Sequence, residues 1–174
     1  MTSMPASQIV LVGMMGAGKS TVAKLLGNAL ERRVIDLDRE IEKASGHSIS
    51  ELFELEGEAG FRAREVEGLH EVLATEEPVV VAAGGGLVTS EAARAALVNT
   101  TCIWLRATTA TLIARVGEST SRPLLRTDPA GTIERLVQER AQWYEDAATM
   151  VIDVDGLNSK QVAAMILDRL EYPC

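Results

Sequence analysis

Aromatic side chains and cysteines are both scarce in this chain, and these absences exclude several classes of protein. Phe, Trp and Tyr make up 3% of the 174 residues, whereas hydrophobic residues as a whole make up 47%, so aliphatic side chains must fill the interior. The two cysteines are Cys102, inside an apolar run, and Cys174, the last residue. This usage excludes a disulfide framework and favours a reducing compartment. A chain of this length is expected to form one domain, residues 1–174.

An excess of basic residues and long apolar runs are also lacking. Lys and Arg number 17 against 25 Asp and Glu, which gives a formal net charge of −8. A nucleic-acid-binding face needs the opposite balance, so nucleic acid is not an expected partner. No apolar run reaches membrane-spanning length, and the neutral residues 1–8 do not resemble a signal peptide. We therefore expect a soluble, cytoplasmic protein.

A glycine-rich run at residues 13–20, with the sequence GMMGAGKS, follows a short apolar strand at 9–12 and opens a helical pattern. It matches the phosphate-binding P-loop. Glycines let successive backbone N–H groups surround a phosphate chain, and the following helix directs its positive end toward it. Lys19 would add a charge at the outer phosphates, and the Ser20 hydroxyl can ligate Mg²⁺. A glycine-rich turn without a ligand is the alternative, but the strand and helix around the run favour a nucleoside triphosphate site.

Apolar runs of strand length alternate with helical periodicity along the whole chain, which predicts an α/β fold with a parallel sheet between helices. The expected strands cover residues 9–12, 34–36, 79–82, 101–105 and 150–154. The expected helices cover 18–30, 38–44, 49–55, 58–74, 90–98, 109–116, 132–147 and 159–170. Ligands of such folds bind beyond the carboxyl ends of the strands.

Polar and glycine residues gather at those expected strand ends. After residues 34–36, strand alternation would place Asp36 and Asp38 on one side. After 79–82, the backbone of residues 84–86 carries no side chain, so another molecule can approach it closely. Residues 117–131 lack an apolar period and include Arg122, which is typical of a lid over a nucleotide.

The two aspartates would have different roles. Asp36, beside the P-loop, could hold Mg²⁺ directly or through water. Asp38 could accept or orient the proton of a hydroxyl that attacks the γ-phosphoryl group. The structural alternative is that Asp38 caps the next helix, and the two roles are compatible.

Two arginines lie on apolar helix faces. Arg62 extends the stripe formed by residues 66, 69 and 73, with Glu65 placed to brace it. Arg140 lies in the middle of the inner face of the helix at 132–147. A buried guanidinium needs an anionic partner, and either arginine alone could form a structural ion pair. Together they favour a small anionic substrate, above all a carboxylate, which matches the planar fork of arginine.

These motifs, in this order, closely resemble shikimate kinases from residue 9 to residue 170. The matching pieces are the P-loop with Thr21, Asp36-Leu37-Asp38, Gly60-Phe61-Arg62 with Glu65, Gly84-Gly85-Gly86, Arg122-Pro123-Leu124-Leu125 and Arg140-Ala141-Gln142-Trp143-Tyr144. The resemblance implies a nucleoside-monophosphate-kinase-like three-layer fold with a five-stranded parallel sheet. It also implies a substrate-binding helical segment at about 36–62 and a mobile lid at about 117–131. The implied reaction transfers the ATP γ-phosphoryl group to the 3-hydroxyl of shikimate, a step toward chorismate and the aromatic amino acids.

The resemblance also implies residue roles. ATP would be bound by Gly16, Ala17, Gly18, Lys19, Ser20, Thr21, Arg115 (beside the adenine) and Arg122 (from the lid). Mg²⁺ would be held by Ser20 and, through water, by Asp36. Shikimate would be bound by Asp38 at its reacting hydroxyl, by Arg62 and Arg140 at its carboxylate, and by the Gly85 backbone at its ring hydroxyls. Asp38, Lys19 and Arg122 would be catalytic. The resemblance places an adenine loop after Asp153. Family members often carry a proline near Ser159, and some carry a basic residue near Leu157. This chain has neither, so no side chain is assigned to the adenine there. A monomer is expected.

Several other functions share parts of this pattern. A gluconate kinase would use the same arginine pair on another carboxylated polyol, whereas a nucleoside-monophosphate kinase would need a denser basic cluster. A nucleotide-dependent switch is disfavoured because no Asn-Lys-x-Asp motif occurs, and residues 128–131, which have a switch-type spelling, follow no strand and are interpreted as a turn. An inactive relative that only binds ATP is disfavoured by the intact set of Lys19, Ser20, Asp36, Asp38 and Arg122.

Overall fold

The computed structural model describes residues 8–116 and 127–171, and it has the predicted α/β architecture. The strands are β1 (Ile9–Val12), β2 (Arg33–Asp36), β3 (Val79–Ala82), β4 (Thr101–Arg106) and β5 (Met150–Asp153). The helices are α1 (Lys19–Leu30), α2 (Leu37–Ser45), α3 (Ile49–Leu73), α4 (Glu91–Leu97), α5 (Thr109–Val116), α6 (Pro129–Ala147) and α7 (Ser159–Glu171), with a 3₁₀ turn η1 at Leu87–Thr89.

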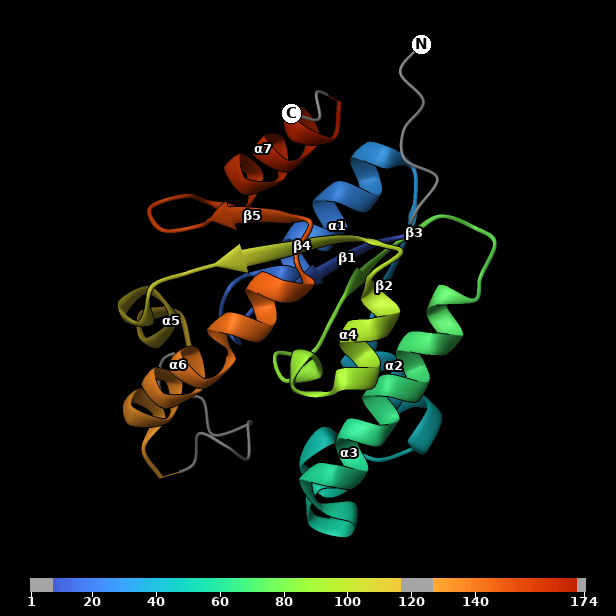
Figure 1. Cartoon of the computed structure of the whole chain (residues 1–174), viewed down its shortest axis with the longest axis vertical. Helices are drawn as coiled ribbons and strands as arrows, with labels where there is room; N and C mark the ends of the chain where they lie inside the picture. The colour runs from blue at the N-terminus through green and yellow to red at the C-terminus, as the bar shows by residue number, and fades with distance from the viewer. Residues whose placement is uncertain (1–7, 117–126, 172–174) are drawn as a thin grey trace.

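The five strands form one parallel sheet in the order β2-β3-β1-β4-β5. β1 is the central strand, and its residues pair with β3 on one side and β4 on the other. Helices α1 and α7 contact each other on one face, while α3, α4 and α6 lie on the other (Figure 1). Because the strand order reverses at β1, a crevice forms at its carboxyl end, where α/β sheets bind ligands.

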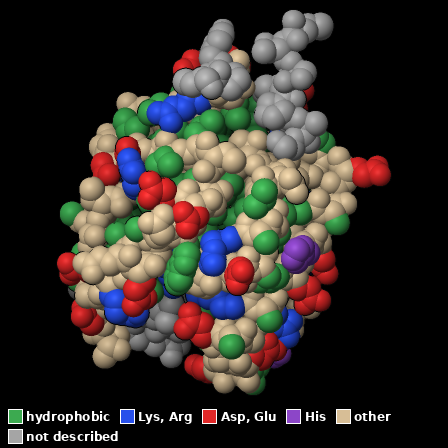
Figure 2. Space-filling model, viewed as in Figure 1, with side chains coloured by type: hydrophobic (Ala, Val, Ile, Leu, Met, Phe, Trp, Pro, Cys, Tyr) green, Lys and Arg blue, Asp and Glu red, His purple; other side chains and the backbone are tan. Residues whose placement is uncertain are grey.

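Aliphatic side chains fill the interior, as the shortage of aromatics requires. All four residues of β1 are buried, and so are all four of β3. Acidic and basic side chains lie interspersed on the face shown in Figure 2. In the described ranges, no helix combines the length and the apolarity that crossing a membrane would need.

The structure confirms one predicted helix break and corrects the start of another helix. The expected helices at 49–55 and 58–74 together form α3, which is broken at Gly57 (φ 71°, ψ 179°), where the prediction separates them. Across the break, Arg64 makes two hydrogen bonds to Glu56, at 2.6 and 2.7 Å. Helix α6 begins at Pro129, three residues early, because the Asp128 side chain accepts a hydrogen bond from the Gly131 N–H.

The predicted turn at residues 128–131 is therefore wrong, because these residues form the cap and first turn of α6. Residues 129–131 of the predicted lid, at about 117–131, belong to α6. Residues 117–126 of that lid, including Arg122, lie outside the described residues.

Close packing between α1 and β2 yields a stability prediction at Gly27. A Cβ atom at this position would lie 2.1 Å from Val34 Cγ2 and 2.9 Å from the Arg32 carbonyl oxygen. We expect Gly27→Ala to lower the free energy of unfolding by about 1–3 kcal/mol through overpacking, despite the better helix propensity of alanine. Urea unfolding measures this, with the exposed Asn28→Ala as control, which should be neutral or slightly stabilising. Equal stabilities of the two variants would contradict the packing argument.

Candidate nucleotide and substrate site

The loop between β1 and α1 has the backbone that a phosphate cradle needs. Gly13, Gly16 and Gly18 have φ values of 143°, 82° and 93°. Residues other than glycine rarely adopt such positive values. A Cβ at Gly13 would also lie 2.6 Å from the Leu105 carbonyl oxygen, and one at Gly16 would lie 2.9 Å from Val116 Cγ2. Gly13 and Gly16 are thus required both by conformation and by packing against β4 and α5, whereas Gly18 is required by conformation alone.

The polar side chains of the P-loop lie where the motif predicts. Lys19 Nζ donates hydrogen bonds to the carbonyl oxygens of Gly13 and Met14, at 2.7 and 2.9 Å, so its charge lies over the loop. The Ser20 hydroxyl, at the start of α1, donates to Asp36 Oδ2 at 2.7 Å. Its lone pairs consequently face away from Asp36 and can accept from or ligate another group.

The two aspartates are arranged differently from the prediction. Helix α2 already begins at Leu37, so Asp38 is helical and the argument from strand alternation is wrong. The cap of α2 is Asp36, whose Oδ1 accepts from the Arg39 N–H at 3.4 Å, and not Asp38. The immediate turn from strand to helix nevertheless brings both carboxylates to one cavity.

This cavity of about 740 Å³ lies beside the P-loop, between α2, α3, α6 and the carboxyl end of β3. It brings together the predicted Ser20, Asp36, Asp38, Arg62, Gly85 and Arg140. The other lining residues are Met15, Arg39, Glu42, Ser48, Ile49, Ser50, Phe53, Phe61, Glu65, Gly84 and Gly86. The arrangement combines an apolar wall with acidic and basic groups next to a phosphate cradle.

Arg62 is largely buried and is paired within its own helix. Nη1 donates to Glu65 Oε2 at 2.5 Å and Nη2 donates to Glu58 Oε1 at 3.2 Å, and the guanidinium lies 5.4 Å from the centre of the Phe61 ring. The structural alternative for Arg62 is therefore realised, as is the predicted brace. Two buried atoms, Arg62 Nε and Glu65 Oε1, have no hydrogen-bond partner within residues 8–116 and 127–171.

The glycines after β3 make room for these side chains. A Cβ on Gly84 would lie 2.2 Å from Glu65 Oε1 and 2.8 Å from Asp38 Oδ1, and one on Gly86 would lie 2.2 Å from the Arg62 Cζ. Gly84, Gly85 and Gly86 also line the cavity, where their backbone remains open to another molecule. At Gly84 and Gly86 the close neighbours are the protein's own charged groups.

Burial, the largest cause, raises the pKa of Glu65 to about 7. The charge of Asp38 acts in the same direction, whereas Arg62 and Arg140 oppose the rise. The Glu65 side chain is 1% exposed, so even the short contact to Arg62 does not offset the loss of hydration. Glu65 therefore binds a proton more tightly than an exposed glutamate does.

Arg140 differs from Arg62 in its partners. It is 3% exposed, and Nη1 donates to the Gly85 carbonyl oxygen at 3.0 Å. The hydroxyl of Tyr144 donates to the same oxygen, and the Tyr144 ring stacks on Trp104 with centroids 5.5 Å apart. In the part of the chain that the structure describes, no carboxylate forms an ion pair with Arg140. Helical spacing places Tyr144 on the inner face of α6, but its hydrogen bond to Gly85 is visible only in three dimensions.

Arg115, near the end of α5, lies on the other side of the P-loop. Its guanidinium donates to the carbonyl oxygens of Gly16 and Ala17, at 3.5 and 3.4 Å. It also donates to those of Val154 and Leu157, both at 3.3 Å. The residue expected beside the adenine is thus adjacent to both the P-loop and the β5–α7 loop.

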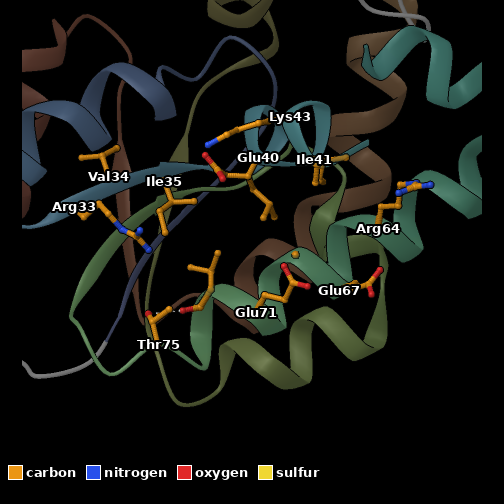
Figure 3. A pocket seen from close by; sticks show the side chains of 14 residues that line it. Arg33, Val34, Ile35, Glu40, Ile41, Lys43, Arg64, Glu67, Glu71 and Thr75 are labelled. Atoms are coloured by element: carbon orange, nitrogen blue, oxygen red, sulfur yellow. Dashed lines mark hydrogen bonds between the residues drawn. The ribbon is translucent and has the colours of Figure 1, made fainter. Parts of the chain in front are cut away.

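A second cavity, of about 530 Å³, lies at the β2 edge of the sheet, against α2 and α3 (Figure 3). Charged residues of both signs line it, among them Arg33, Lys43, Glu67 and Glu71. It contains none of the residues that the sequence predicted for the site. The cavity beside the P-loop is therefore the candidate site.

Comparisons with known proteins agree with this geometry. The family model described as shikimate kinase matches residues 15–171. The chain belongs to the shikimate kinase family. A shikimate kinase of Marinomonas sp. (strain MWYL1) is 40% identical over 95% of this chain and 93% of its own length. The structure of a shikimate kinase from Acinetobacter baumannii, solved in complex with shikimate, has a TM-score of 0.91 and 34% identity, and covers 95% of this chain and 93% of that one.

The predicted family and fold class are confirmed by these matches and by the five-stranded parallel sheet. A gluconokinase from Sinorhizobium meliloti also shares the fold, with a TM-score of 0.61 over 95% of this chain and 91% of that one. Its identity is 16%, so this likeness concerns the fold alone.

The buried carboxyl of Glu65 predicts a pH-dependent stability. A pKa raised from 4.5 to about 7 on folding means that the folded state holds this proton more tightly. The stabilisation is complete below the unfolded pKa and is lost as the pH rises through about 7. We expect Glu65→Gln, which cannot ionise, to gain in free energy of unfolding relative to the parent chain as the pH rises through that window. Urea unfolding between about pH 5 and pH 8 tests this.

The matched control is Glu67→Gln, at an exposed position two residues further along α3. This variant keeps Glu65, so its free energy of unfolding should show the same Glu65-dependent change with pH as that of the parent chain. A Glu65→Gln difference that stays constant over the window would contradict the assigned shift.

Proposed function

We propose that this chain transfers the γ-phosphoryl group of ATP to the 3-hydroxyl of shikimate and releases shikimate 3-phosphate and ADP. The observation that carries the proposal is Arg140, a buried guanidinium without a carboxylate partner among the described residues, in a cavity beside the P-loop. A buried charge of this kind favours an anionic ligand. Membership of the shikimate kinase family, and a relative solved with shikimate, support that acid as the ligand.

Arg140 and Arg62 would hold the carboxylate. Both line the cavity, and Arg62 keeps a buried Nε with no partner in the described ranges. Its pairing with Glu65 and Glu58 fixes the guanidinium before a ligand arrives, so less side-chain freedom is lost on binding. Gly85 would meet the ring hydroxyls through its N–H, because Arg140 and Tyr144 already use its carbonyl oxygen.

Asp38 would hold the reacting hydroxyl. It lies on the first turn of α2 and lines the same cavity as the two arginines and Ser20. A carboxylate there can accept the hydroxyl proton or orient the oxygen for in-line attack on the γ-phosphorus. Closure of the predicted lid would exclude bulk water from the reacting groups and so limit hydrolysis of ATP.

The phosphates would be bound by the backbone of residues 16–21, by Lys19 and by Arg122, which lies outside the described residues. The oxygens of Ser20 and Asp36 fit Mg²⁺, which takes few protein ligands beside phosphate oxygens and water. Both Asp36 oxygens already accept hydrogen bonds, from Ser20 and from the Arg39 N–H, which favours a contact through water. When bound, Mg²⁺ offsets the charge of the phosphates.

The proposed reaction is a step toward chorismate and the aromatic amino acids. We place the protein in the cytoplasm as a monomer, and the buried free thiol of Cys102 is compatible with a reducing compartment. The deciding experiment incubates purified protein with Mg²⁺ and ATP, and offers shikimate or gluconate in a coupled assay of ADP release. Phosphorus NMR should identify a phosphate ester at the 3-position of shikimate. Transfer to gluconate alone would overturn the proposal in favour of the rival kinase.

Arg140 should contribute mainly to recognition of the carboxylate. We expect Arg140→Ala to raise the KM for shikimate roughly 30-fold or more, as the loss of a buried charge partner does. The parent enzyme should also prefer shikimate strongly to its methyl ester, and Arg140→Ala should lose most of that preference. The control is Arg135→Ala on the same helix, which removes only an exposed ion pair to Glu139. An unchanged preference in Arg140→Ala would remove this residue from carboxylate binding.

Arg122 should contribute to turnover. Because a lid arginine acts on charge in the transition state, we expect Arg122→Ala to lower kcat about 1,000-fold, by comparison with arginine fingers. The Kd for shikimate, measured by calorimetry without nucleotide, should change little. Near-normal turnover in this variant would exclude Arg122 from the chemistry.

A further inference from the structure

An exposed side chain, Asp155, connects the β5–α7 loop to the start of α5. Its Oδ1 accepts from the Thr108 N–H at 3.1 Å, from the Thr108 hydroxyl at 2.8 Å and from the Thr111 hydroxyl. The second oxygen lies 3.2 Å from the same N–H. Thr108 in turn caps α5, because its hydroxyl accepts from the Thr111 N–H at 3.4 Å. One carboxylate thus holds together residues that are 44 and 47 positions away in the sequence.

The same loop is also the partner of Arg115. Thr111 and Arg115 are four residues apart on α5 and therefore lie on one side of that helix. Arg115 reaches the carbonyl oxygens of Val154 and Leu157, which flank Asp155, and those of Gly16 and Ala17 in the P-loop. The P-loop, α5 and the loop at residues 154–157 consequently form one connected surface.

The two ends of this loop are fixed separately, so Asp155 acts on its centre. The Val154 N–H donates to the Arg106 carbonyl oxygen at 2.9 Å. Asn158 and Gln161 exchange hydrogen bonds of 2.9 and 3.0 Å at the start of α7. Between them, Gly156 adopts a φ of 71°, which turns the chain sharply. The hydrogen bonds of Thr111 and Thr108 lower the pKa of Asp155, so the tie involves the charged carboxylate at neutral pH.

The position of this surface matches the path of a nucleotide. In-line transfer requires the acceptor and the nucleoside on opposite sides of the γ-phosphorus. The acceptor cavity lies on the β3 side of the P-loop. The nucleoside must then extend toward β4 and β5, where Arg115 and residues 154–157 are found.

We propose that Asp155 is a positioning residue for the nucleoside part of ATP, because it holds the 154–157 loop against α5 and so fixes the surface beside Arg115. The inference rests on the proposed function, since it takes the occupant of the P-loop to be ATP. It assigns no contact between Asp155 and the nucleotide. The hydrogen bonds order the loop before the nucleotide binds. Without them, the free-energy cost of ordering the loop would be part of binding and would lower the affinity.

The test compares two ligands that share the phosphate cradle. ADP carries the base, whereas inorganic tripolyphosphate has only the phosphate chain. We expect Asp155→Ala to raise the calorimetric Kd for ADP about fivefold to tenfold and to leave the Kd for tripolyphosphate within about twofold, tenfold being about 1.4 kcal/mol. In turnover, the KM for ATP should rise similarly, with kcat and the KM for shikimate nearly unchanged.

Three further variants sharpen the comparison. Asp155→Asn keeps an acceptor oxygen for the Thr108 N–H and should recover most of the ADP affinity. Thr111→Val removes one hydroxyl with little change of shape and should raise the Kd for ADP about twofold. Asp153→Ala is the matched control, because it removes an equal charge and an exposed ion pair to Arg106 without touching α5. It should bind ADP as the parent does.

Each alternative outcome contradicts the inference in a distinct way. A parent-like Kd for ADP in Asp155→Ala, even with a lowered Tm, would mean that the tie is only structural. An equal rise in the Kd for ADP and in the Kd for tripolyphosphate would place the effect at the P-loop instead. These measurements need no acceptor, so they remain decisive even if the chain fails to phosphorylate shikimate.

Discussion

Burial of the Arg62–Glu65 ion pair against the backbone at the end of β3 is the constraint on which the substrate side of the site depends. Burying either charge without the other would be more costly, and the pair can approach the sheet only because Gly84 and Gly86 lack side chains. This close approach positions α3, and α3 in turn forms one wall of the cavity. The wall is therefore closely packed where the guanidinium is located, and the neighbouring Asp38 shares the same crowded space at Gly84.

The two arginines of the cavity have unequal charge environments. Arg62 has two carboxylates within its own helix, whereas Arg140 is held by a carbonyl oxygen that also accepts from Tyr144. A carbonyl leaves the positive charge of Arg140 in place, so attraction for an incoming acid is concentrated there. A bound carboxylate would in turn add negative charge near Glu65 and favour its protonated form. In the proposed complex, Arg62 would thus be the preoriented partner of the carboxylate and Arg140 the one with the stronger electrostatic attraction.

Local patterns predicted the elements of this protein better than the contacts between them. The P-loop motif and the helical spacing of Arg62 and Arg140 depend on neighbours in the sequence. The predicted helix after the P-loop and the inward positions of the two arginines agree with the structure. The cap by Asp36 was missed because it depends on α2 starting directly after β2. The break between the helices at 49–55 and 58–74 was predicted, because Gly57 interrupts the apolar periodicity and also adopts a non-helical conformation. Asp155 gave no signal, since an exposed aspartate in a loop looks ordinary until its distant threonine partners are known.

The central position of β1 explains how distant contacts can meet at one loop. Because β3 and β4 flank β1, the P-loop touches the glycines after β3 on one side and Arg115 of α5 on the other. A Cβ on Gly85 would lie only 3.2 Å from the Met15 nitrogen, while Gly16 and Ala17 accept from Arg115. The acceptor side and the nucleoside side are therefore both packed against the same few backbone atoms. A phosphate chain held by those atoms would have its two ends directed toward the two sides, which is the alignment that in-line phosphoryl transfer requires.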